Sequence, residues 1–391
     1  LRHHLQTPPD AGRGMCWTAL ARTGYSGAAT GRCCNWLGHT TPGGKKPMRC
    51  WPICLRSNNT PYWVATPGAP TNSLDLRTAP SMTPTSTPLS TRLLASLPED
   101  LDRASLIGRI WQPGLGALPV AVHQGQLFDL SPLAPTCSHW LERTQPAADL
   151  AQALAGGQLR RITTLDAVLS NSDEARRDSQ QPWLLAPCDL QVIKASGVTF
   201  VASLLERVIE EQARGDAAKA DGIRREISHI LGDQLGSIVP GSAEATEVKQ
   251  VLLARGAWSQ YLEVGLGPDA EIFTKAPVLS AVGSGADVGI HPKSEWNNPE
   301  PEIVLCVNSR GQTLGASLGN DVNLRDFEGR SALLLGKAKD NNASCAIGPF
   351  IRLFDAHFSM DDICTATLGL HVQGPDGFNW HGSGAMSGIS R

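Results

Sequence analysis

Residues 300–307 read Glu300-Pro301-Glu302-Ile303-Val304-Leu305-Cys306-Val307, and a second apolar run, 314–318, follows the turn residues 308–311. Two short apolar runs joined by a turn that contains asparagine and glycine predict a β-hairpin. Side chains two positions apart on a strand point to the same face. We therefore expect Glu300 and Glu302 to share a face, and Asp321, just beyond the second run, to reach the same point from the neighbouring strand.

Three converging carboxylates would form a site for a hard cation. Oxygen ligands of this kind suit Mg²⁺ or Mn²⁺. Such an ion can hold a 2-oxo acid and stabilise its enolate. The plain alternative is a solvated strand edge with ordinary acidic residues. The pattern thus makes Glu300, Glu302 and Asp321 candidate metal ligands, with Mg²⁺ or Mn²⁺ as the expected cofactor.

Size and composition exclude several classes of protein. The chain has 391 residues, enough for two domains, and its 41% hydrophobic content supports a core. A formal net charge of -3 gives no reason to expect nucleic acid as a partner. No run of about 18 apolar residues predicts a membrane span. The first residues lack the charged and apolar regions of a secretion signal, so the cytoplasm is the expected location.

The first part of the chain differs from the rest. Residues 1–74 contain a single acidic residue, Asp10, and five of the ten cysteines lie before residue 55. The cysteine spacings provide no pair of metal-binding knuckles, which argues against a small zinc module. Residues 66–90 are rich in Pro, Thr and Ser, a composition typical of linkers. We expect residues 1–91 to be a disordered or non-native leader and linker.

Apolar patterns divide the remainder into two parts. Residues 92–184 predict a small N-terminal α+β domain, and residues 185–391 a larger domain that holds the hairpin. Helical spacing of apolar residues is clearest in 200–213. The other expected elements are short helices near 141 and 150–154, helices over 217–231 and after Arg325, and strands at 117–122, 277–279 and 365–372.

Several motifs, in order, resemble those of the fumarylacetoacetate hydrolase superfamily. They are Glu271-Ile272-Phe273-Thr274-Lys275, Pro299-Glu300-Pro301-Glu302, the run from Asn320 to Asp326, Gly336-Lys337, and Ile347-Gly348-Pro349-Phe350. The resemblance covers about residues 185–391. It implies an α+β fold with a mixed β-sandwich roll or barrel as catalytic core, usually in a homodimer. The chain stops before the strands that close this core in the family, so we expect a C-terminally truncated, incomplete fold.

The resemblance also assigns roles to residues. It implies that Glu300, Glu302 and Asp321 bind the metal, that Lys337 and Glu206 are catalytic, and that Arg325 and Lys275 bind substrate. Each has a plainer interpretation: Lys337 as a surface lysine, Glu206 as part of an acidic helix, and Arg325 as the ion-pair partner of Asp326 or Glu328. His291, alone near the acidic strand, is expected to be structural.

One departure from the family bears on the reaction. Hydrolytic members place a histidine where this chain has Ser203, three residues before the glutamate position that Glu206 keeps. A serine hydroxyl does not replace imidazole as a general base near neutral pH. We therefore expect a metal-dependent lyase that dehydrates a 2-keto-3-deoxy sugar acid, a pentonate, through a metal-stabilised enolate. The alternatives are a hydrolase that cleaves a C–C bond of an acylpyruvate, and an inactive fragment.

Overall fold

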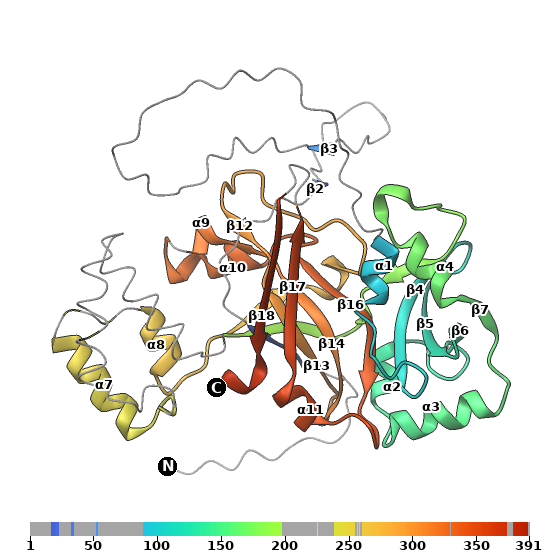
Figure 1. Cartoon of the computed structure of the whole chain (residues 1–391), viewed down its shortest axis with the longest axis horizontal. Helices are drawn as coiled ribbons and strands as arrows, with labels where there is room; N and C mark the ends of the chain where they lie inside the picture. The colour runs from blue at the N-terminus through green and yellow to red at the C-terminus, as the bar shows by residue number, and fades with distance from the viewer. Residues whose placement is uncertain are drawn as a thin grey trace, which may run out of the picture.

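The computed structural model describes residues 89–197, 225 and 238–389, except 255, 257, 259, 329 and 374–377, together with the backbone of 17–22, 33–34 and 52–53. Figure 1 shows three groups of elements: an N-terminal unit with α1–α4, a central sheet, and a pair of helices, α7 and α8. The expected helices 200–213 and 217–231, with Ser203 and Glu206, lie outside the described residues, apart from residue 225. No described helix has the length and hydropathy needed to cross a membrane.

A twelve-stranded mixed sheet organises the chain. Its strands run in the order β10-β9-β1-β13-β14-β16-β4-β5-β6-β7, with β11 beside β16 and β8 beside β4. Among the described residues this sheet stays open at both ends and closes no barrel. The predicted α+β class is confirmed. The strands are β1 (Trp17–Arg22), β4 (Leu106–Gln112), β5 (Gly116–His123), β6 (Gln126–Asp129), β7 (Arg161–Thr164), β8 (Trp183–Leu185), β9 (Val192–Ser196), β10 (Ile272–Ala276), β11 (Ala281–Val282), β13 (Pro301–Val307), β14 (Thr313–Asp321) and β16 (Cys345–Leu353).

Two-stranded ribbons and short helices complete the described fold. Helix α11 begins with a capping box, in which Ser359 and Asp362 satisfy each other's backbone N–H groups. Expected short helices near 141 and 150–154 are confirmed as α2 and α3. The ribbons are β12 (Asn297–Asn298) with β15 (Asn323–Leu324), β17 (Thr367–Gln373) with β18 (Asn379–Ala385), and β2 (Cys33–Cys34) with β3 (Pro52–Ile53); the helices are α1 (Leu89–Leu94), α2 (Cys137–Leu141), α3 (Pro146–Ala155), α4 (Leu165–Asn171), α7 (Ala243–Ala254), α8 (Gln260–Leu266), α9 (Arg325–Glu328), α10 (Leu335–Lys339) and α11 (Met360–Thr365).

The predicted hairpin is formed by β13 and β14. Their register pairs Pro301 with Asn320 and Glu302 with Gly319. The turn at the other end is fixed by Asn308, whose side-chain oxygen accepts hydrogen bonds of 3.0 Å from the backbone N–H groups of both Arg310 and Gln312. Gly311 has a φ of 75°, a value that glycine adopts without strain. This turn sets the alignment of the two strands.

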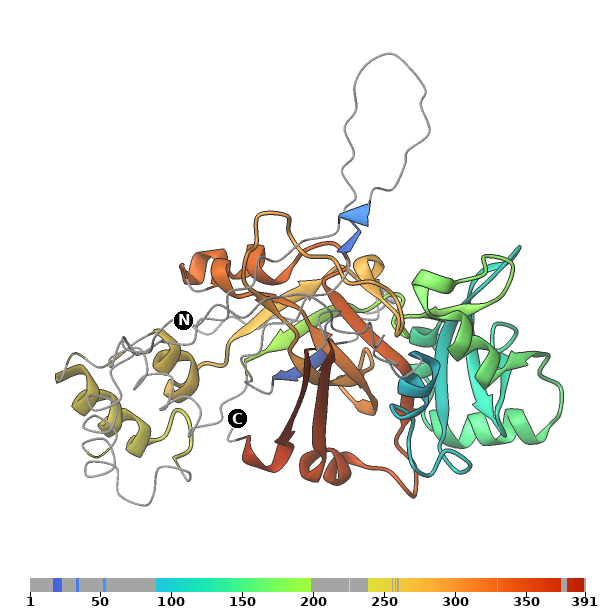
Figure 2. The same ribbon diagram turned by 45° about the horizontal axis from the view of Figure 1, so that its top comes forward.

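The two faces of the hairpin are buried against different partners. Ile303 and Ala316 pack on one face with Leu368 and Met386, from the region of the β17–β18 ribbon. Val304 packs on the other face, in a cluster with Ile193 and Ala276 of β9 and β10. Burial on both faces explains why β13 is a continuous apolar run rather than an alternating one. Figure 2 shows the β17–β18 ribbon standing apart from the main sheet.

The N-terminal unit is joined to the hairpin by the sheet itself. Strand β4 pairs antiparallel with β16, matching Ile351 with Ile107 and Arg352 with Leu106. Arg352 also makes a two-pronged ion pair with Asp100, with a 2.8 Å contact through Nη2. The described structure is therefore continuous from the unit around 92–184 into the hairpin. The proposed boundary near 184 remains a prediction.

Most of the expected leader, residues 1–91, lies outside the described residues, so that expectation remains a prediction; strand β1, from within it, lies between β9 and β13. The expectation near residue 278 has a different outcome. The predicted strand at 277–279 is wrong, because Val278–Ser280 forms a turn of 3₁₀ helix after Pro277. Proline fixes φ and donates no hydrogen bond, so it favours such a turn over a strand.

Candidate metal centre

Glu300, Glu302 and Asp321 come together as the hairpin alignment predicts. Each offers a carboxylate oxygen, and these oxygens all lie within 4.8 Å of one another. All three residues are buried, with exposures of 4%, 1% and 1% respectively. The backbone N–H of Asp321 donates to the carbonyl of Glu300 at 2.9 Å, which ties the ends of β13 and β14. Buried carboxylates are costly without compensating charge, so this cluster is not an ordinary strand edge.

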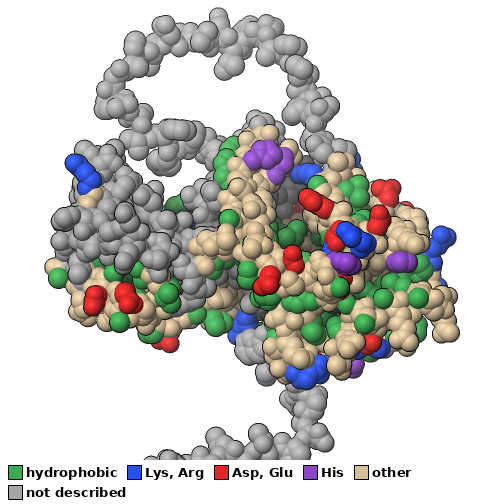
Figure 3. Space-filling model, turned by 60° about the horizontal axis from the view of Figure 1, so that its bottom comes forward, with side chains coloured by type: hydrophobic (Ala, Val, Ile, Leu, Met, Phe, Trp, Pro, Cys, Tyr) green, Lys and Arg blue, Asp and Glu red, His purple; other side chains and the backbone are tan. Residues whose placement is uncertain are grey.

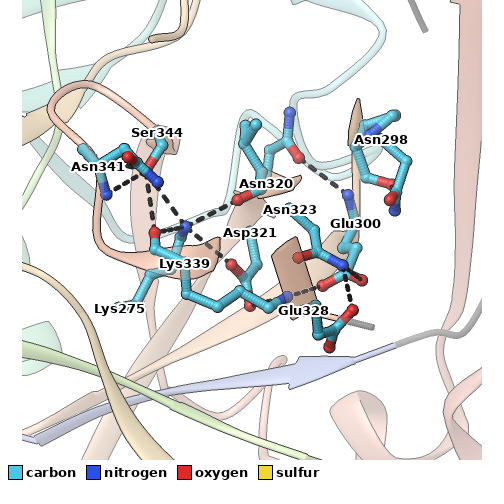
Figure 4. Close-up of polar contacts among 12 residues, drawn as sticks. Lys275, Asn298, Glu300, Asn320, Asp321, Asn323, Glu328, Lys339, Asn341 and Ser344 are labelled. Atoms are coloured by element: carbon cyan, nitrogen blue, oxygen red, sulfur yellow. Dashed lines mark hydrogen bonds and ion pairs between the residues drawn. The ribbon is translucent and has the colours of Figure 1, made fainter. Parts of the chain in front are cut away.

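Two buried lysines supply compensating charge (Figure 4). The Lys339 ammonium contacts Glu300 and lies 3.1 Å from Asp321 Oδ2. The Lys275 ammonium lies 3.0 Å from Asp321 Oδ1. It also donates to the Val322 carbonyl at 2.9 Å and to the carbonyl of Lys339. Both lysines are 0% exposed. Three carboxylates and two ammonium groups leave a formal charge of minus one.

Asparagine side chains surround Glu300. Asn320 accepts a 3.1 Å hydrogen bond from the Glu300 backbone N–H, while Asn323 Nδ2 donates to Glu300 Oε1 at 3.2 Å. The side-chain oxygens of Asn298 and Asn323 are buried and have no hydrogen-bond partner in the described part of the chain. Buried oxygens of this kind normally have a partner, which can be water or an ion. The Asn323 side chain also contacts Glu300, so its oxygen lies where a cation or its bound water would fit.

A divalent ion fits this set of donors. Octahedral Mg²⁺ holds oxygens at about 2.0–2.1 Å, which places neighbouring ligands about 3 Å apart and opposite ligands about 4.2 Å apart. Oxygens within 4.8 Å reach that spacing through side-chain movements of less than about 1 Å. Lys339 contacts oxygens that an ion would use, so its ammonium and the ion compete for the same charge.

Lys337 lies outside the cluster. Its side chain is exposed, and its ammonium lies 5.3 Å from the centre of the Phe327 ring. Lys339, two positions later on α10, is the lysine that enters the site. Residues two apart on a helix point to nearly opposite sides, so only one of them can face the carboxylates. The sequence contains both lysines, and the motif Gly336-Lys337 drew attention to the first. The catalytic role of Lys337 remains a prediction, while Lys339 is the lysine that contacts the cluster.

Arg325 pairs with Glu328, as its plainer interpretation expected. The distance from Arg325 Nη1 to Glu328 Oε2 is 2.6 Å. The same Glu328 oxygen accepts a 2.6 Å hydrogen bond from Asn323 Nδ2, which in turn contacts Glu300. Arg325 is thus connected to a candidate ligand through two side chains. Lys275, predicted to bind substrate, instead contacts Asp321 and backbone carbonyls.

His291 and Cys345 border the site without entering it. The His291 ring lies edge-on to Phe327, with centres 5.3 Å apart. Partial burial and the charge of Lys337 hold the pKa of His291 below its usual value, so the ring is neutral near pH 7. Burial raises the pKa of the Cys345 thiol far above neutrality. Glu206, the other predicted catalytic residue, lies outside the described residues and remains a prediction.

Comparisons with known proteins agree with the predicted resemblance. No protein-family model matches the chain. A stretch of 81 residues is 40% identical to 2-dehydro-3-deoxy-D-arabinonate dehydratase of Saccharolobus solfataricus, covering 21% of this chain and 27% of that protein. A stretch of 91 residues is 37% identical to a probable 2-keto-3-deoxyxylonate dehydratase of Haloferax volcanii, covering 23% and 31%. The matched stretches thus span about a third or less of these relatives.

Solved structures show a weaker likeness. A 2-keto-3-deoxy-D-arabinonate dehydratase complexed with magnesium and 2,5-dioxopentanoate is 20% identical with a TM-score of 0.43, over 73% of this chain and 78% of that chain. Fumarylacetoacetate hydrolase from psychrophilic Exiguobacterium antarcticum is 15% identical with a TM-score of 0.40, over 74% and 78%. The sequence matches confirm that the chain resembles dehydratases of 2-keto-3-deoxy-pentonates.

Proposed function

We propose that this chain is a divalent-metal-dependent lyase that dehydrates a 2-keto-3-deoxy sugar acid. The observation that carries the proposal is the convergence of Glu300, Glu302 and Asp321 in a buried site that also holds a lysine ammonium. The substrate class comes from the names of the two sequence relatives. A small 2-oxo acid is the expected partner, and a pentonate is the expected size.

The three carboxylates are the proposed ligands of Mg²⁺ or Mn²⁺. An ion bound there would hold the oxygens of a 2-oxo acid and reduce the cost of negative charge beside the oxo group. Asn323 orients Glu300 through its 3.2 Å hydrogen bond. Lys275 orients Asp321 through its 3.0 Å contact. Neighbours that fix the ligands in this way commonly change metal affinity by about 10–100-fold.

Lys339 is the proposed proton-transfer residue. Dehydration removes a proton from C3, next to the oxo group, and expels the C4 hydroxyl, which takes up a proton and leaves as water. A proton shift from C5 to C3, and from the C5 hydroxyl to C4, then gives the aldehyde. A lysine amine can accept and return a proton when burial and neighbours tune it. Lys339 is buried in the cluster, whereas Lys337 is exposed on the other side of α10. We therefore transfer the role predicted for Lys337 to Lys339, while Glu206 remains a second candidate.

Arg325 is a proposed positioning residue. It neutralises Glu328, which shares Asn323 with Glu300. Without the positive charge of Arg325, Glu328 would compete with Glu300 for the Asn323 amide or repel the Glu300 carboxylate. The chain of contacts therefore keeps Glu300 in one orientation, and a direct contact of Arg325 with substrate is not needed for this role.

The experiment is a substrate panel with metal control. The purified chain is stripped with EDTA and incubated with 2-keto-3-deoxy-D-arabinonate or 2-keto-3-deoxyxylonate, with and without Mg²⁺, while the aldehyde product 2,5-dioxopentanoate is measured. We expect product only with metal. Cleavage of acylpyruvates without turnover of the sugar acids would replace the lyase by the hydrolase. Metal binding without turnover of any substrate would indicate an inactive fragment.

A further inference from the structure

Two histidines face each other on the outer side of the β17–β18 ribbon. His371 and His381 are directly opposite in the antiparallel register. Their rings are stacked, with centres 3.8 Å apart and planes 19° apart, and both side chains are exposed. The space-filling view shows histidine side chains gathered at one exposed point near the top of the face drawn (Figure 3). Nothing in the proposed dehydration uses this pair.

Asn379 fixes the orientation of one of the rings. Its side-chain oxygen lies 2.5 Å from Nε2 of His371. An amide oxygen only accepts hydrogen bonds, so Nε2 of His371 is the donor in this contact and Nδ1 is the ring nitrogen left for an ion. Histidines that bind metals commonly donate their other ring N–H to an oxygen in this way. His371 thus has the oxygen support that metal-bound histidines commonly have.

The spacing of the rings suits chelation. A tetrahedral zinc ion with bonds of about 2.0–2.1 Å holds two nitrogens about 3.4 Å apart. The ring centres are 3.8 Å apart and the planes are nearly parallel, so χ rotations that tilt the two rings toward a shared ion would bring one nitrogen of each ring to that distance. Residues directly opposite on antiparallel strands have Cβ atoms only about 4.5–5.5 Å apart, so the backbone need not move.

We propose that His371 and His381 form a second metal site, for a transition-metal ion such as Zn²⁺, Ni²⁺ or Cu²⁺. Imidazole nitrogens select these ions over Mg²⁺, which prefers oxygen. The ribbon packs, through Leu368, against Ile303, which points away from the face that Glu302 shares with Val304. The histidine site therefore lies on the other side of the sheet from the carboxylates. Its ion would fasten the two strands of a ribbon that has no third strand in the described chain.

Cu²⁺ and Zn²⁺ are the probes for this proposal, used with the full chain. Electron paramagnetic resonance of the Cu²⁺ complex reports the number of nitrogen ligands, and calorimetry with Zn²⁺ gives affinity. We expect two coordinated nitrogens and one strong site for each chain. His371→Ala or His381→Ala should reduce Zn²⁺ affinity by more than tenfold and remove one nitrogen ligand from the Cu²⁺ complex. Asn379→Ala should reduce Zn²⁺ affinity by about tenfold.

Matched controls separate this site from adventitious binding. His357→Ala changes an exposed histidine on the turn between Asp355 and Phe358 and should leave Zn²⁺ affinity unchanged. Glu302→Gln should leave the number of nitrogen ligands in the Cu²⁺ complex unchanged, which separates this site from the carboxylates. Equal Zn²⁺ affinity and equal nitrogen counts in wild type and His381→Ala would overturn the proposal, as would an equal loss in His357→Ala. All three histidines are exposed, and circular dichroism verifies folding.

Discussion

Lys337 and Lys339 lie two positions apart on α10, yet only Lys339 enters the carboxylate cluster. The Lys339 ammonium lies 3.1 Å from Asp321 and is 0% exposed, while Lys337 is exposed above Phe327. The pair offers an internal comparison, because both residues share a helix, a chemistry and nearly a position. Substitutions at the two positions therefore separate a role inside the carboxylate cluster from an effect of positive charge at the protein surface.

Lys339→Met should abolish the proposed dehydration, and Lys337→Met should not. Removal of the buried ammonium leaves Glu300 and Asp321 without one counter-charge, which costs about 3–5 kcal/mol of stability for a buried pair. We expect more than about a hundredfold loss of kcat for Lys339→Met and less than about threefold for Lys337→Met. The measurements are steady-state kinetics and thermal melts of both variants. Equal losses would show that the lysine charge acts from a distance.

Removal of one carboxylate should weaken the metal site. Glu302→Gln keeps the size of the side chain but loses its charge. We expect Mg²⁺ or Mn²⁺ affinity to fall by more than about tenfold, measured by calorimetry. In the wild type, metal at a hundred times its dissociation constant should add about 2.7 kcal/mol to the free energy of unfolding, and EDTA should remove it. If Glu302→Gln gains the same metal-dependent stability, the ion is held elsewhere.

Arg325→Met tests the contact chain to Glu300. A buried carboxylate, Glu328, would lose its 2.6 Å partner. A partner lost in this way costs about 1–3 kcal/mol. We expect reduced metal affinity together with reduced kcat, since the effect passes through Asn323. The double variant Arg325→Met with Glu328→Gln should recover part of the metal affinity and part of kcat. A rise in KM alone, with metal affinity intact, would instead support the predicted direct contact with substrate.

Because of the ion pair between Asp100 and Arg352, the stability of the protein should depend on pH in the acidic range. Hydrogen bonding to Arg352 lowers the pKa of the Asp100 carboxyl below 3.8. A carboxyl whose pKa is depressed by folding stabilises the protein fully above its unfolded pKa, and this contribution disappears as the pH falls through the folded pKa. We expect Asp100→Asn to melt at a lower temperature than the wild type at pH 7. The difference should shrink below about pH 4. A constant difference down to pH 2 would mean that the charge is irrelevant.

The sequence predicted the hairpin and the carboxylate convergence because both depend on local rules. Alternation by two places Glu300 and Glu302 together, and a short turn brings Asp321 beside them. The choice between Lys337 and Lys339 depended instead on how α10 rotates against Phe327 and the sheet. The partners of Lys275 are equally remote, since Val322 and Asp321 lie more than forty positions away. Such contacts follow from packing, which no local pattern encodes.

The turn held by Asn308 has a consequence for how this site can vary. It lies roughly 20 Å along the strand from the carboxylates, since seven strand residues span about that length. A shift of one residue in the pairing turns each side chain to the opposite face. One amino acid inserted beside Gly311 would then shift β14 and present Asn320 where Asp321 now stands. Every proposed ligand would persist in the gene product, and a cation would meet an amide in place of the third carboxylate.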